Sequence, residues 1–562
     1  MTGHRDLVES EQEDIRKIVR TLFADLQSRY PACRLTVMSP LAEGADTLVA
    51  EIALDMALDL VVPLPKSVDH YLADFRDPAA REKFHSLHQR ATDSFVLSSS
   101  IPPAPEGIEP LKWHADYAYA QLGIYLSAHC HVLLAIWDGS SSKHLGGTAQ
   151  VVRFHHDDIM PGITTRTTSS LQNLVDDESD LVFHISCSRK RHAHNGGNGS
   201  RAPDWAWYTK DPDRPRSKDL PAQHDLIFRR IAEFNTDAAN IGGGNGSLLA
   251  NRNSDRLPDG MDTIDRLFTI ADRLAIHFQH RTLRSLVFIH VMALLMGLMF
   301  ILYSDFSSRQ WYLLGFVAAF ALVWTTQQIA RRGAWHRKYL DYRTLAEGLR
   351  IQLYWAAAGV SSEKKWRFTH DSYLQSQNPE FGWIRNVMRV AGARTDAAQG
   401  TGADGLGFAL REWLGDDNSG QLGYFLKKAR ERGRYHRVTS TLGVISLVTS
   451  VAIVFGFLLL GSAIPANVAV LLKVVMGTML LLFAVREGYA YSTAEKELLK
   501  QYEYMLGIYQ SAARRLRQAT RDDEKRLILR ALGQSALNEH SSWILMHRER
   551  SPEQGEIWRM GS

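Results

Sequence analysis

The chain has 562 residues, of which 45% are hydrophobic and 22% are charged, with 40 glycines and 18 prolines. At about 150 residues per domain this length predicts roughly three to four domains, and the composition excludes a wholly disordered chain, a collagen or a simple repeat array. The formal net charge of +4 is too small for a protein that coats DNA by electrostatic attraction. Cys33, Cys130 and Cys187 are too far apart along the chain for a disulfide scaffold or a cysteine-based zinc site.

Four apolar stretches in the second half of the chain predict an all-α membrane domain. They cover about 286–303, 311–328, 442–461 and 466–485, and each is long enough to cross a bilayer core of about 30 Å as a helix. Short turns at 304–310 and 462–467 join them in two pairs. A buried helix of a soluble protein can also be apolar, but two closely spaced pairs favour two transmembrane hairpins.

The charges that flank these stretches predict their orientation. Lysine and arginine precede the first and third stretches and follow the second and fourth, whereas the two turns contain one arginine and no lysine. Because positive charge stays on the untranslocated side, we expect a multi-pass protein of the cell inner membrane with both termini in the cytoplasm. The first 30 residues are polar and helical in pattern, unlike a signal peptide.

Residues 1–187 alternate between helical and strand-like patterns, as in an α/β domain with a parallel sheet. Ser10 and Glu13 have the spacing of a helix capping box, and an apolar helical face follows them to Leu26. We predict strands at 35–39, 60–64, 95–97, 131–139 and 180–186, and further helices at about 47–58 and 112–128. The clearest buried strand is HVLLAIWDG at 131–139.

Three loops of this region predict a ligand site. In parallel sheets ligands bind beyond the carboxyl ends of the strands, and TGHRD (2–6), SPLAEGAD (39–46) and WDGSSSKHLGGTAQVV (137–152) are loops of this kind. Glycine lets backbone N–H groups approach a phosphate, carboxylates accept ribose hydroxyls, and arginine pairs with phosphate oxygens. Packing alone would explain any one loop, but three at one edge favour a nucleotide-type site. Its candidate residues are Thr2, Gly3, His4, Arg5, Gly44, Asp46, Asp138, Gly139, Gly146, Gly147 and Thr148.

The same loops resemble the SLOG superfamily, which comprises Rossmann-like nucleotide-binding domains related to cytokinin-activating phosphoribohydrolases and to the DNA-uptake protein DprA. The resemblance covers about 1–187 and rests on TGHRD, on the G-A-D loop with its P-L-P strand end, and above all on WDG…GGTA. The distal half resembles SLATT-type transmembrane effectors through RTLAEGLRIQLYW (343–355), WIRNVMR (383–389) and GQLGYF (420–425). The resemblance implies a cytoplasmic sensor of a nucleotide or nucleotide-derived signal that controls a pore-forming or membrane-disrupting effector in a bacterial defence system.

One departure from the family pattern bears on catalysis. Phosphoribohydrolases of this superfamily carry P-G-G-x-G-T-x-x-E, whose glutamate belongs to the catalytic site, whereas this chain has L-G-G-T-A-Q-V-V at 145–152 and no acidic residue from 148 to 156. We therefore expect binding without turnover and assign no catalytic residue. The alternatives are a membrane-tethered nucleotide hydrolase, in which Asp138 or Glu43 would activate water, and a non-catalytic membrane scaffold.

The remaining segments connect these parts. Residues 188–222 are polar and rich in glycine and proline, which predicts a linker or a surface excursion, and their His192 and His194 lack the further ligands that a metal site needs. We divide the rest into a helical segment with the first hairpin (223–360), a cytoplasmic helical connector (361–420) and a helical segment with the second hairpin (421–562). A helix at about 262–280 is expected to run on into the first span.

The segments that follow the two hairpins, 339–355 and 495–516, have similar helical patterns. Glu347 and Arg350 in the first segment could form a gating ion pair, but their spacing is also that of an ordinary surface pair, which we favour. A pore made from four spans per chain needs several subunits, so we expect a homo-oligomer, and no nucleic acid as partner. Four tryptophans could form an aromatic cage for a cationic ligand, but we favour a packing role for them; they are Trp355, Trp366, Trp383 and Trp413.

Two expectations concern single positions. Lys473 lies seven residues after Ala466, about 10 Å inside the fourth span, where it either lines a pore or extends to the membrane interface. The first phosphate loop of a Rossmann-like domain normally follows a central strand, yet TGHRD begins at residue 2. We expect a natural start upstream that adds an apolar strand of about six to ten residues, unless 181–186 fills that position.

Overall fold

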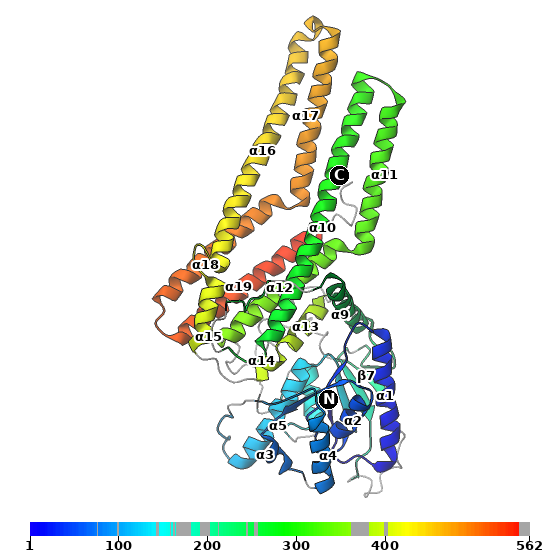
Figure 1. Cartoon of the computed structure of the whole chain (residues 1–562), viewed down its shortest axis with the longest axis vertical. Helices are drawn as coiled ribbons and strands as arrows, with labels where there is room; N and C mark the ends of the chain where they lie inside the picture. Colours follow the sequence, from blue (N-terminus) through cyan, green and yellow to red (C-terminus); the bar gives the residue numbers. More distant parts are fainter. Residues whose placement is uncertain are drawn as a thin grey trace. The chain divides into compact units, whose positions relative to one another are not determined.

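The computed structural model describes residues 1–75, 77–97, 101–141, 145–157, 159–160, 163, 181–190, 203–211, 213–242, 246–251, 257–360, 381–397 and 403–549. The chain forms two compact units that alternate along the sequence (Figure 1). The α/β unit comprises Met1–Gly242, Arg256–Leu267 and Gly359–Gly405. The helical unit comprises Gly243–Asp255, Phe268–Ala358 and Leu406–Ser562.

Two groups of strands form the centre of the α/β unit, with the orders β1-β5-β6-β7-β8 and β2-β3-β4. All pairings are parallel except those of β7 with β6 and with β8, so the sheet is mixed. Every residue of β5 is buried, as its uninterrupted apolar sequence predicts. The strands are β1 (Thr2–Gly3), β2 (Thr36–Met38), β3 (Asp59–Leu64), β4 (Asp93–Val96), β5 (Leu133–Trp137), β6 (Val182–Ser186), β7 (Trp205–Tyr208) and β8 (Arg216–Ser217).

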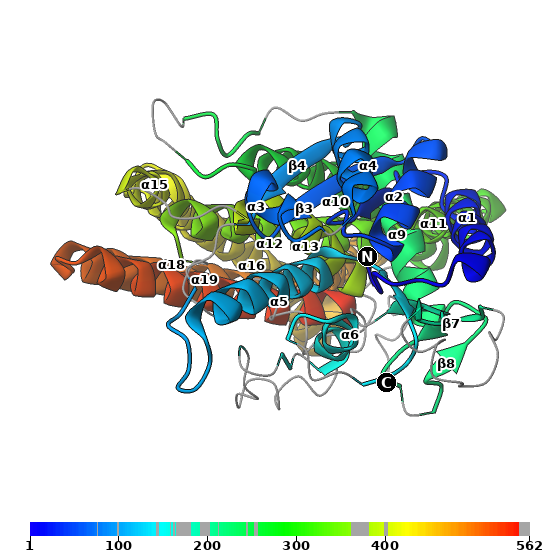
Figure 2. The ribbon, with the colours of Figure 1, turned by 90° about the horizontal axis from the view of Figure 1, so that it is seen from below.

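Helices cover these strands, and α5 (Pro110–His129) is buried at nearly every residue from Tyr117 on. Helices α5 and α6 run next to each other (Figure 2), and a Cβ atom on Gly123 of α5 would lie 2.5 Å from Val151 of α6. Glycine at this position therefore permits the close approach. The other helices of the unit are η1 (Glu9–Glu11), α1 (Gln12–Arg29), α2 (Ala45–Asp55), α3 (Val68–Leu72), α4 (Pro78–Gln89), α6 (Thr148–Asp157) and α9 (Ala222–Ile241).

Two helices from the middle of the chain complete the α/β unit. We call α13 (Gly382–Ala391) and α14 (Ala393–Ala397) the connector helices, because they lie between the two membrane hairpins in the sequence. The Tyr125 hydroxyl of α5 donates to the carbonyl of Ala393 over 2.8 Å, and Nδ1 of His129 lies 2.7 Å from the carbonyl oxygen of Arg389. The connector helices are thus bonded to the second half of α5.

The five predicted strands are confirmed as β2 to β6, and two other expectations for this unit are wrong. Residues 188–222 are not a linker throughout, because Trp205 and Trp207 of β7 pack their rings on Phe183 of β6 at 5.1 and 4.9 Å between centroids. The capping box is absent, since α1 begins after Glu11 with no side-chain cap. Residues 191–202, with His192 and His194, and residues 361–380 of the predicted connector lie outside the described residues.

The neighbours of β1 bear on the expectation about the chain's start. β1 pairs with β5, and the Met1 nitrogen donates to the carbonyl of Met38 at the end of β2 over 2.9 Å. The alternative that 181–186 takes the position beside β1 is wrong, because β6 pairs with β5 and β7. The upstream start stays a prediction.

The helical unit contains two similar series of helices. Each begins with a helix of 41 residues, turns back into a helix of 24 or 27 residues, and continues as a third helix of 24 residues. In each series an alanine with positive φ, Ala334 (47°) or Ala494 (49°), precedes the third helix, at a cost of about 1–2 kcal/mol per residue. The first series is α10 (Met261–Ile301), of which Met261–Leu267 belong to the α/β unit, with η2 (Leu302–Phe306), α11 (Gln310–Gly333) and α12 (Trp335–Ala358). The second series is α16 (Gly420–Leu460), η6 (Gly461–Ala463), α17 (Ala466–Ser492) and α18 (Glu495–Gln518).

Three further elements pack with the third helices of the two series: α15 (Ala403–Phe408), the π-helical turn η5 (Ala409–Leu414) and α19 (Asp522–Glu549). The indole N–H of Trp355 donates to the carbonyl of Leu529 of α19, and the ring of Trp413 stacks on Tyr354. Packing is confirmed as the environment of three of the four tryptophans, because Trp355, Trp383 and Trp413 are each 1% exposed. Trp366 lies outside the described residues.

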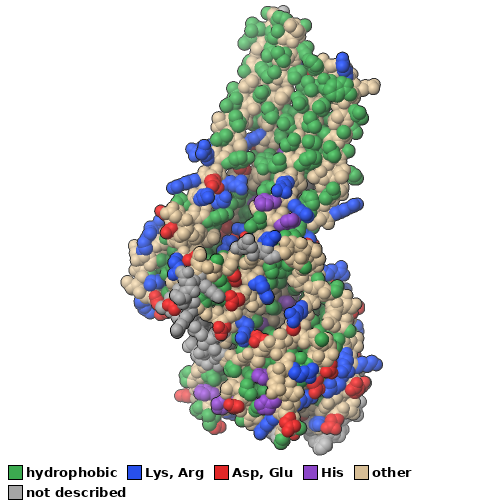
Figure 3. All heavy atoms as spheres, viewed as in Figure 1, with side chains coloured by type: hydrophobic (Ala, Val, Ile, Leu, Met, Phe, Trp, Pro, Cys, Tyr) green, Lys and Arg blue, Asp and Glu red, His purple; other side chains and the backbone are tan. Residues whose placement is uncertain are grey.

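Four helices of the described chain are long and apolar enough to cross a membrane, which confirms the predicted number of spans. In the most apolar stretch of each, at most 22% of the residues are buried inside the protein, and in α17 none is. A helix from a soluble core would be buried, so the alternative of soluble helices does not hold. Hydrophobic side chains cover the drawn face of both hairpins (Figure 3), as expected where lipid is the solvent.

The two hairpins contact each other through small residues of α10 and α17. A Cβ atom on Gly297 of α10 would lie 2.5 Å from the Leu481 side chain, and one on Gly477 of α17 would lie 3.2 Å from Ile301. Small residues are enriched at helix contacts in membranes, because they let the backbones approach closely.

We expect Gly297→Leu to lower the stability of the helical unit by about 1–3 kcal/mol, because the new side chain overfills the contact with Leu481. The matched control is Gly456→Leu on α16, where a Cβ atom has no neighbour within 4 Å. The measurement is the thermal unfolding midpoint of the detergent-purified protein. Equal midpoints for the two variants would contradict this packing.

Candidate functional site

The structure brings all three predicted loops to one edge of the sheet. β1 and β5 are parallel neighbours, so the residues that follow them, His4 and Asp138, leave the sheet at the same edge. The backbone N–H of His4 donates to the carbonyl of Ile136, and the N–H of Ala45, in the second loop, donates to the carbonyl of His4. Hydrogen bonds thus join the TGHRD loop to the second loop and to the strand that leads into the third.

A histidine–aspartate pair lies where the first and third loops meet. Nε2 of His4 is 3.2 Å from Oδ1 of Asp138, and both side chains are nearly buried, at 10% and 12% exposed. Burial lowers the pKa of His4, although the hydrogen bond to Asp138 opposes this. Burial alone would raise the pKa of Asp138, but the N–H of Ser140 and the His4 side chain hold it below its usual range. The pair therefore combines an ionised carboxylate with a neutral imidazole at neutral pH.

Glycine is required where the second loop crosses the first. Gly44 has a φ of 85°, and a Cβ atom there would lie 2.4 Å from the carbonyl oxygen of Arg5. A Cβ atom on Gly3 would lie 2.4 Å from that of Ala45. These two glycines therefore serve close packing of the loops, and Thr2 is paired with Ala135 inside the sheet.

Arg5 is the predicted residue best placed to meet an anion. Its side chain is exposed, lies over the ring of Tyr119 at 5.3 Å and makes no ion pair with a described residue. The ammonium of Lys66 is 5.2 Å from the centre of the same ring and 2.8 Å from Oδ2 of Asp74, which also accepts a hydrogen bond from the Tyr119 hydroxyl over 2.6 Å. Burial, and then this hydrogen bond, raise the pKa of Tyr119 to about 12.

The third loop leads into α6, whose first turn presents backbone N–H groups. Gly146 has a φ of 75°, and a Cβ atom there would lie 2.7 Å from the backbone nitrogen of Ala120 on α5. The carbonyl of Gly147 accepts the N–H groups of Gln150 and Val151, so α6 begins at Thr148 and contacts β1 and β5. Gly139 has a φ of 79° and open space around it. Residues 142–144 of this loop lie outside the described residues.

Asp46 differs from its expected role as an exposed acceptor of ribose hydroxyls. Its side chain is only 5% exposed, and Oδ1 has no hydrogen-bond partner among the described residues. Burial raises the pKa of Asp46 to about 7. Oε1 of the neighbouring Glu43 is also buried without a described partner. The second loop therefore holds one buried carboxyl group, that of Asp46, and one buried carboxyl oxygen of the partly exposed Glu43.

Three residues of this site were missed by the sequence reasoning: Lys66, Asp74 and Tyr119. Lys66 follows the predicted strand at 60–64, so the rule that selected the other loops would also have found it. Tyr119 is in the middle of a predicted helix, and no local pattern distinguishes it. The described residues contain no group of three or more His, Cys, Asp or Glu side chains that could hold a metal. Lys473 lies apart from this site, exposed on α17 of the helical unit.

This edge of the sheet combines two cations, Arg5 and Lys66, with the N–H groups at the start of α6. The His4–Asp138 pair lies at the same edge. This set can bind an anion and orient a polar group beside it. Comparisons of the chain with protein-family models, with curated proteins and with solved structures give no match.

We expect Asp46→Asn to stabilise the protein at pH 7 by on the order of 2–4 kcal/mol, since asparagine has no charge to bury. Because the folded pKa is about 7, above the ordinary value of 3.8, the wild type loses stability as pH rises from about 4 to 7, and the variant does not. The measurement is the thermal midpoint between pH 4 and 8.

Asp138→Asn is the matched control with the opposite sign. The folded pKa of Asp138 is lowered, so its ionised form stabilises the protein above its ordinary pKa and this contribution is lost as the pH falls. Asp138→Asn should therefore lower the midpoint at pH 7. A parallel pH dependence in wild type and Asp46→Asn would contradict the burial of an ionisable Asp46.

Proposed function

We propose that this protein is a bacterial inner-membrane sensor–effector. Its α/β unit, as a Rossmann-like domain of the SLOG type, binds a nucleotide or nucleotide-derived signal. Its helical unit, as a SLATT-like module with both termini in the cytoplasm, forms or opens a pore in response as part of a defence system. No turnover of the ligand is needed, since the ligand acts by its different affinities for the closed and open states.

The observation that carries this proposal is the convergence of the three loops at the His4–Asp138 pair, 3.2 Å apart. The phosphate would lie against Arg5, Lys66 and the first turn of α6, where cations and backbone N–H groups meet. The Asp138 carboxylate, whose pKa is held below its usual range, would accept hydroxyl groups of the ligand. Asp46 is buried, so it would pack under the second loop and would not contact the ligand.

Helix α5 offers a route from this site to the membrane hairpins. Tyr119 on α5 contacts Arg5, and Ala120 contacts the Gly146 turn, whereas Tyr125 and His129 bond to the connector helices. About six residues of helix, or roughly 9 Å, separate the two sets of contacts. A ligand that moves Tyr119 would therefore shift α5 against α13 and α14, which lead to one hairpin in each direction along the chain.

On the membrane side, four spans per chain are too few for a wide pore, so we propose a homo-oligomer. The exposure of Lys473 within an otherwise uncharged stretch favours a contact other than lipid, because a charge in the hydrocarbon region is costly. A neighbouring chain or a water-filled path would provide it.

One observation favours a second candidate function, a membrane-tethered nucleotide hydrolase. Oε1 of Glu43 is buried beside the candidate site and has no described partner, as a carboxylate that activates water would require. Release of base or ribose from a nucleotide by the wild type, lost in Glu43→Gln, would favour this enzyme over the sensor.

We expect Arg5→Ala to weaken nucleotide binding at least ten-fold, since it removes a charge-assisted contact with the phosphate. Calorimetry and thermal shift of the full-length protein with AMP, NAD and a cyclic dinucleotide measure the change. Arg34→Ala is the matched control, because Arg34 is a highly exposed arginine that pairs with Asp59 at the opposite end of the strands. No shift with any nucleotide would favour the scaffold alternative, and equal loss in both variants would contradict the site.

We expect Lys473→Leu to leave membrane insertion unchanged and to alter the ion flux of the activated protein, because the lysine faces the conducting path. Flux is measured in proteoliposomes, and insertion by resistance to carbonate extraction. Unchanged flux would show that Lys473 only extends to the interface.

A further inference from the structure

The helical unit contains a cavity of about 200 Å³ with the chemistry of a ligand site, between α12, α16, α18 and α19. Its centre is Glu347 of α12. Nη2 of Arg343 lies 2.5 Å from one Glu347 oxygen, and Nη1 of Arg350 lies 2.6 Å from the other. The prediction of an ordinary surface pair is therefore wrong, because the Glu347 and Arg350 side chains are only 18% and 12% exposed and line a cavity.

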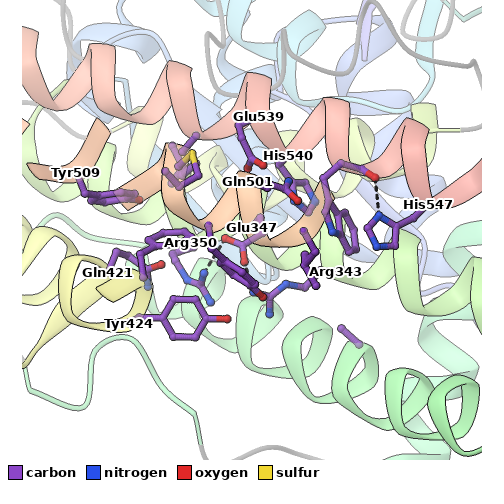
Figure 4. A pocket seen from close by; sticks show the side chains of 18 of the residues that line it. Arg343, Glu347, Arg350, Gln421, Tyr424, Gln501, Tyr509, Glu539, His540 and His547 are labelled. Carbon is purple, nitrogen blue, oxygen red and sulfur yellow. Dashed lines mark hydrogen bonds and ion pairs between the residues drawn. The ribbon is translucent and has the colours of Figure 1, made fainter. Parts of the chain in front are cut away.

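Four polar atoms that line this cavity are buried and have no hydrogen-bond partner among the described residues. They belong to three helices, and they are Nε of Arg350, Oε1 of Gln501, Oε1 of Glu539 and Nε2 of His540. In Figure 4, Gln501, Glu539 and His540 lie on one side of Glu347. Arg343 and Arg350 lie on the other side of it. His540 is 8% exposed overall. Because native proteins pair nearly all buried polar groups, such a cluster indicates a place where something polar is bound.

The fixed charges around the cavity favour an anion. Arg343, Arg350 and Arg432 carry three positive charges, against which Glu347 and Asp272, the second partner of Arg343, carry two negative ones. Arg432 is exposed at the cavity and makes no ion pair with a described residue. Burial, and then the charge of Glu347, raise the pKa of Glu539 to about 8, so its carboxyl is largely neutral at pH 7. With three arginines, two ionised carboxylates and a neutral Glu539, the net charge at the cavity is +1.

The two sides of the cavity need different groups from a ligand. The arginine side offers N–H donors, which suit phosphate oxygens. The opposite side offers the oxygens of Gln501 and Glu539, which suit hydroxyl or amino donors. Aromatic rings close the cavity between them, among them Tyr424, Tyr502 and Tyr509.

We propose that this cavity binds a phosphorylated small molecule, with its phosphate against Arg350 and Arg432 and its hydroxyl or amino groups donating to Gln501 and Glu539. A phospholipid headgroup and a free phosphorylated metabolite share this chemistry. The ligand would join the two helices, α12 and α18, that directly follow the second and fourth spans, so its binding would bias the arrangement of both hairpins. This site is independent of the nucleotide site proposed for the α/β unit.

Two variants and one matched control test the proposal. Arg432→Ala removes an exposed arginine of the cavity, and Gln501→Leu removes an acceptor with little change in shape. The control is Arg434→Ala, an exposed arginine of α16 outside the cavity. Neither Arg432 nor Arg434 is buried, so both variants should fold.

Binding of glycerol 3-phosphate and AMP to the full-length protein in detergent is measured by calorimetry, and thermal stability is measured in nanodiscs of phosphatidylcholine with and without phosphatidylglycerol. At least ten-fold weaker binding of a soluble probe in Arg432→Ala and Gln501→Leu, but not in Arg434→Ala, supports a free metabolite. Stabilisation by phosphatidylglycerol alone, lost in the same two variants, supports a lipid headgroup.

No effect of either kind, or an equal effect in Arg434→Ala, overturns the proposal. Arg5→Ala is measured in parallel with the same soluble probes. A loss of binding in Arg5→Ala alone would support the site of the α/β unit and contradict the cavity, and a loss in the cavity variants alone would do the reverse.

Discussion

Helix α5 packs Tyr119 and Ala120 against the candidate ligand loops and Tyr125 and His129 against the connector helices, and most features of the α/β unit follow from this. From Tyr117 on, nearly every residue of α5 is buried, and this part of the helix cannot adjust one contact without moving the others, because protein interiors are packed as densely as crystals. Glycine is therefore needed at two positions. A Cβ atom at 123 would meet the Val151 side chain of α6, and one at 146 would meet the backbone of α5 at Ala120. The same rigidity makes α5 suitable for transmitting a change at the loops.

In the helical unit the bilayer imposes a different constraint. The apolar side chains of α10, α11, α16 and α17 remain exposed because lipid surrounds them, so apolar burial holds the hairpins together only weakly. Close contacts at Gly297 and Gly477 hold α10 and α17 together instead. Outside the spans, water is again the solvent, and the unit has a conventional core around Trp355 and Trp413, in which the Glu347 cavity is a polar exception.

The two halves of this unit share the same order of helix lengths. Each half also has an alanine with positive φ, at 334 and at 494. A non-glycine residue in the left-handed region persists only where its surroundings hold it. Both alanines separate a span from the helix that follows it outside the membrane. Each therefore fixes the turn between a span and the helix that follows it.

The sequence predicted those features that depend on local pattern. Continuous apolar runs identified β5 and the four spans, and glycine-rich strand ends identified the loops around His4 and Asp138. Features that depend on distant partners were missed. β7 is a strand because its tryptophans meet Phe183, and the connector helices join the α/β unit because α5 bonds to their carbonyls. Neither the burial of Asp46 nor the inward position of Glu347 could be seen from spacing, because both depend on helices that pack over them.

If α5 couples the candidate ligand loops to the connector helices, a change at the loops also reaches α13 and α14. Hydrogen–deuterium exchange of the full-length protein is measured with and without whichever of AMP, NAD and a cyclic dinucleotide binds in calorimetry. Coupling through α5 predicts slower exchange at 2–6, 44–46, 138–141 and 145–148 on binding, together with a change in α5 and at 382–397. Protection of the loops with no change at 382–397 would contradict it.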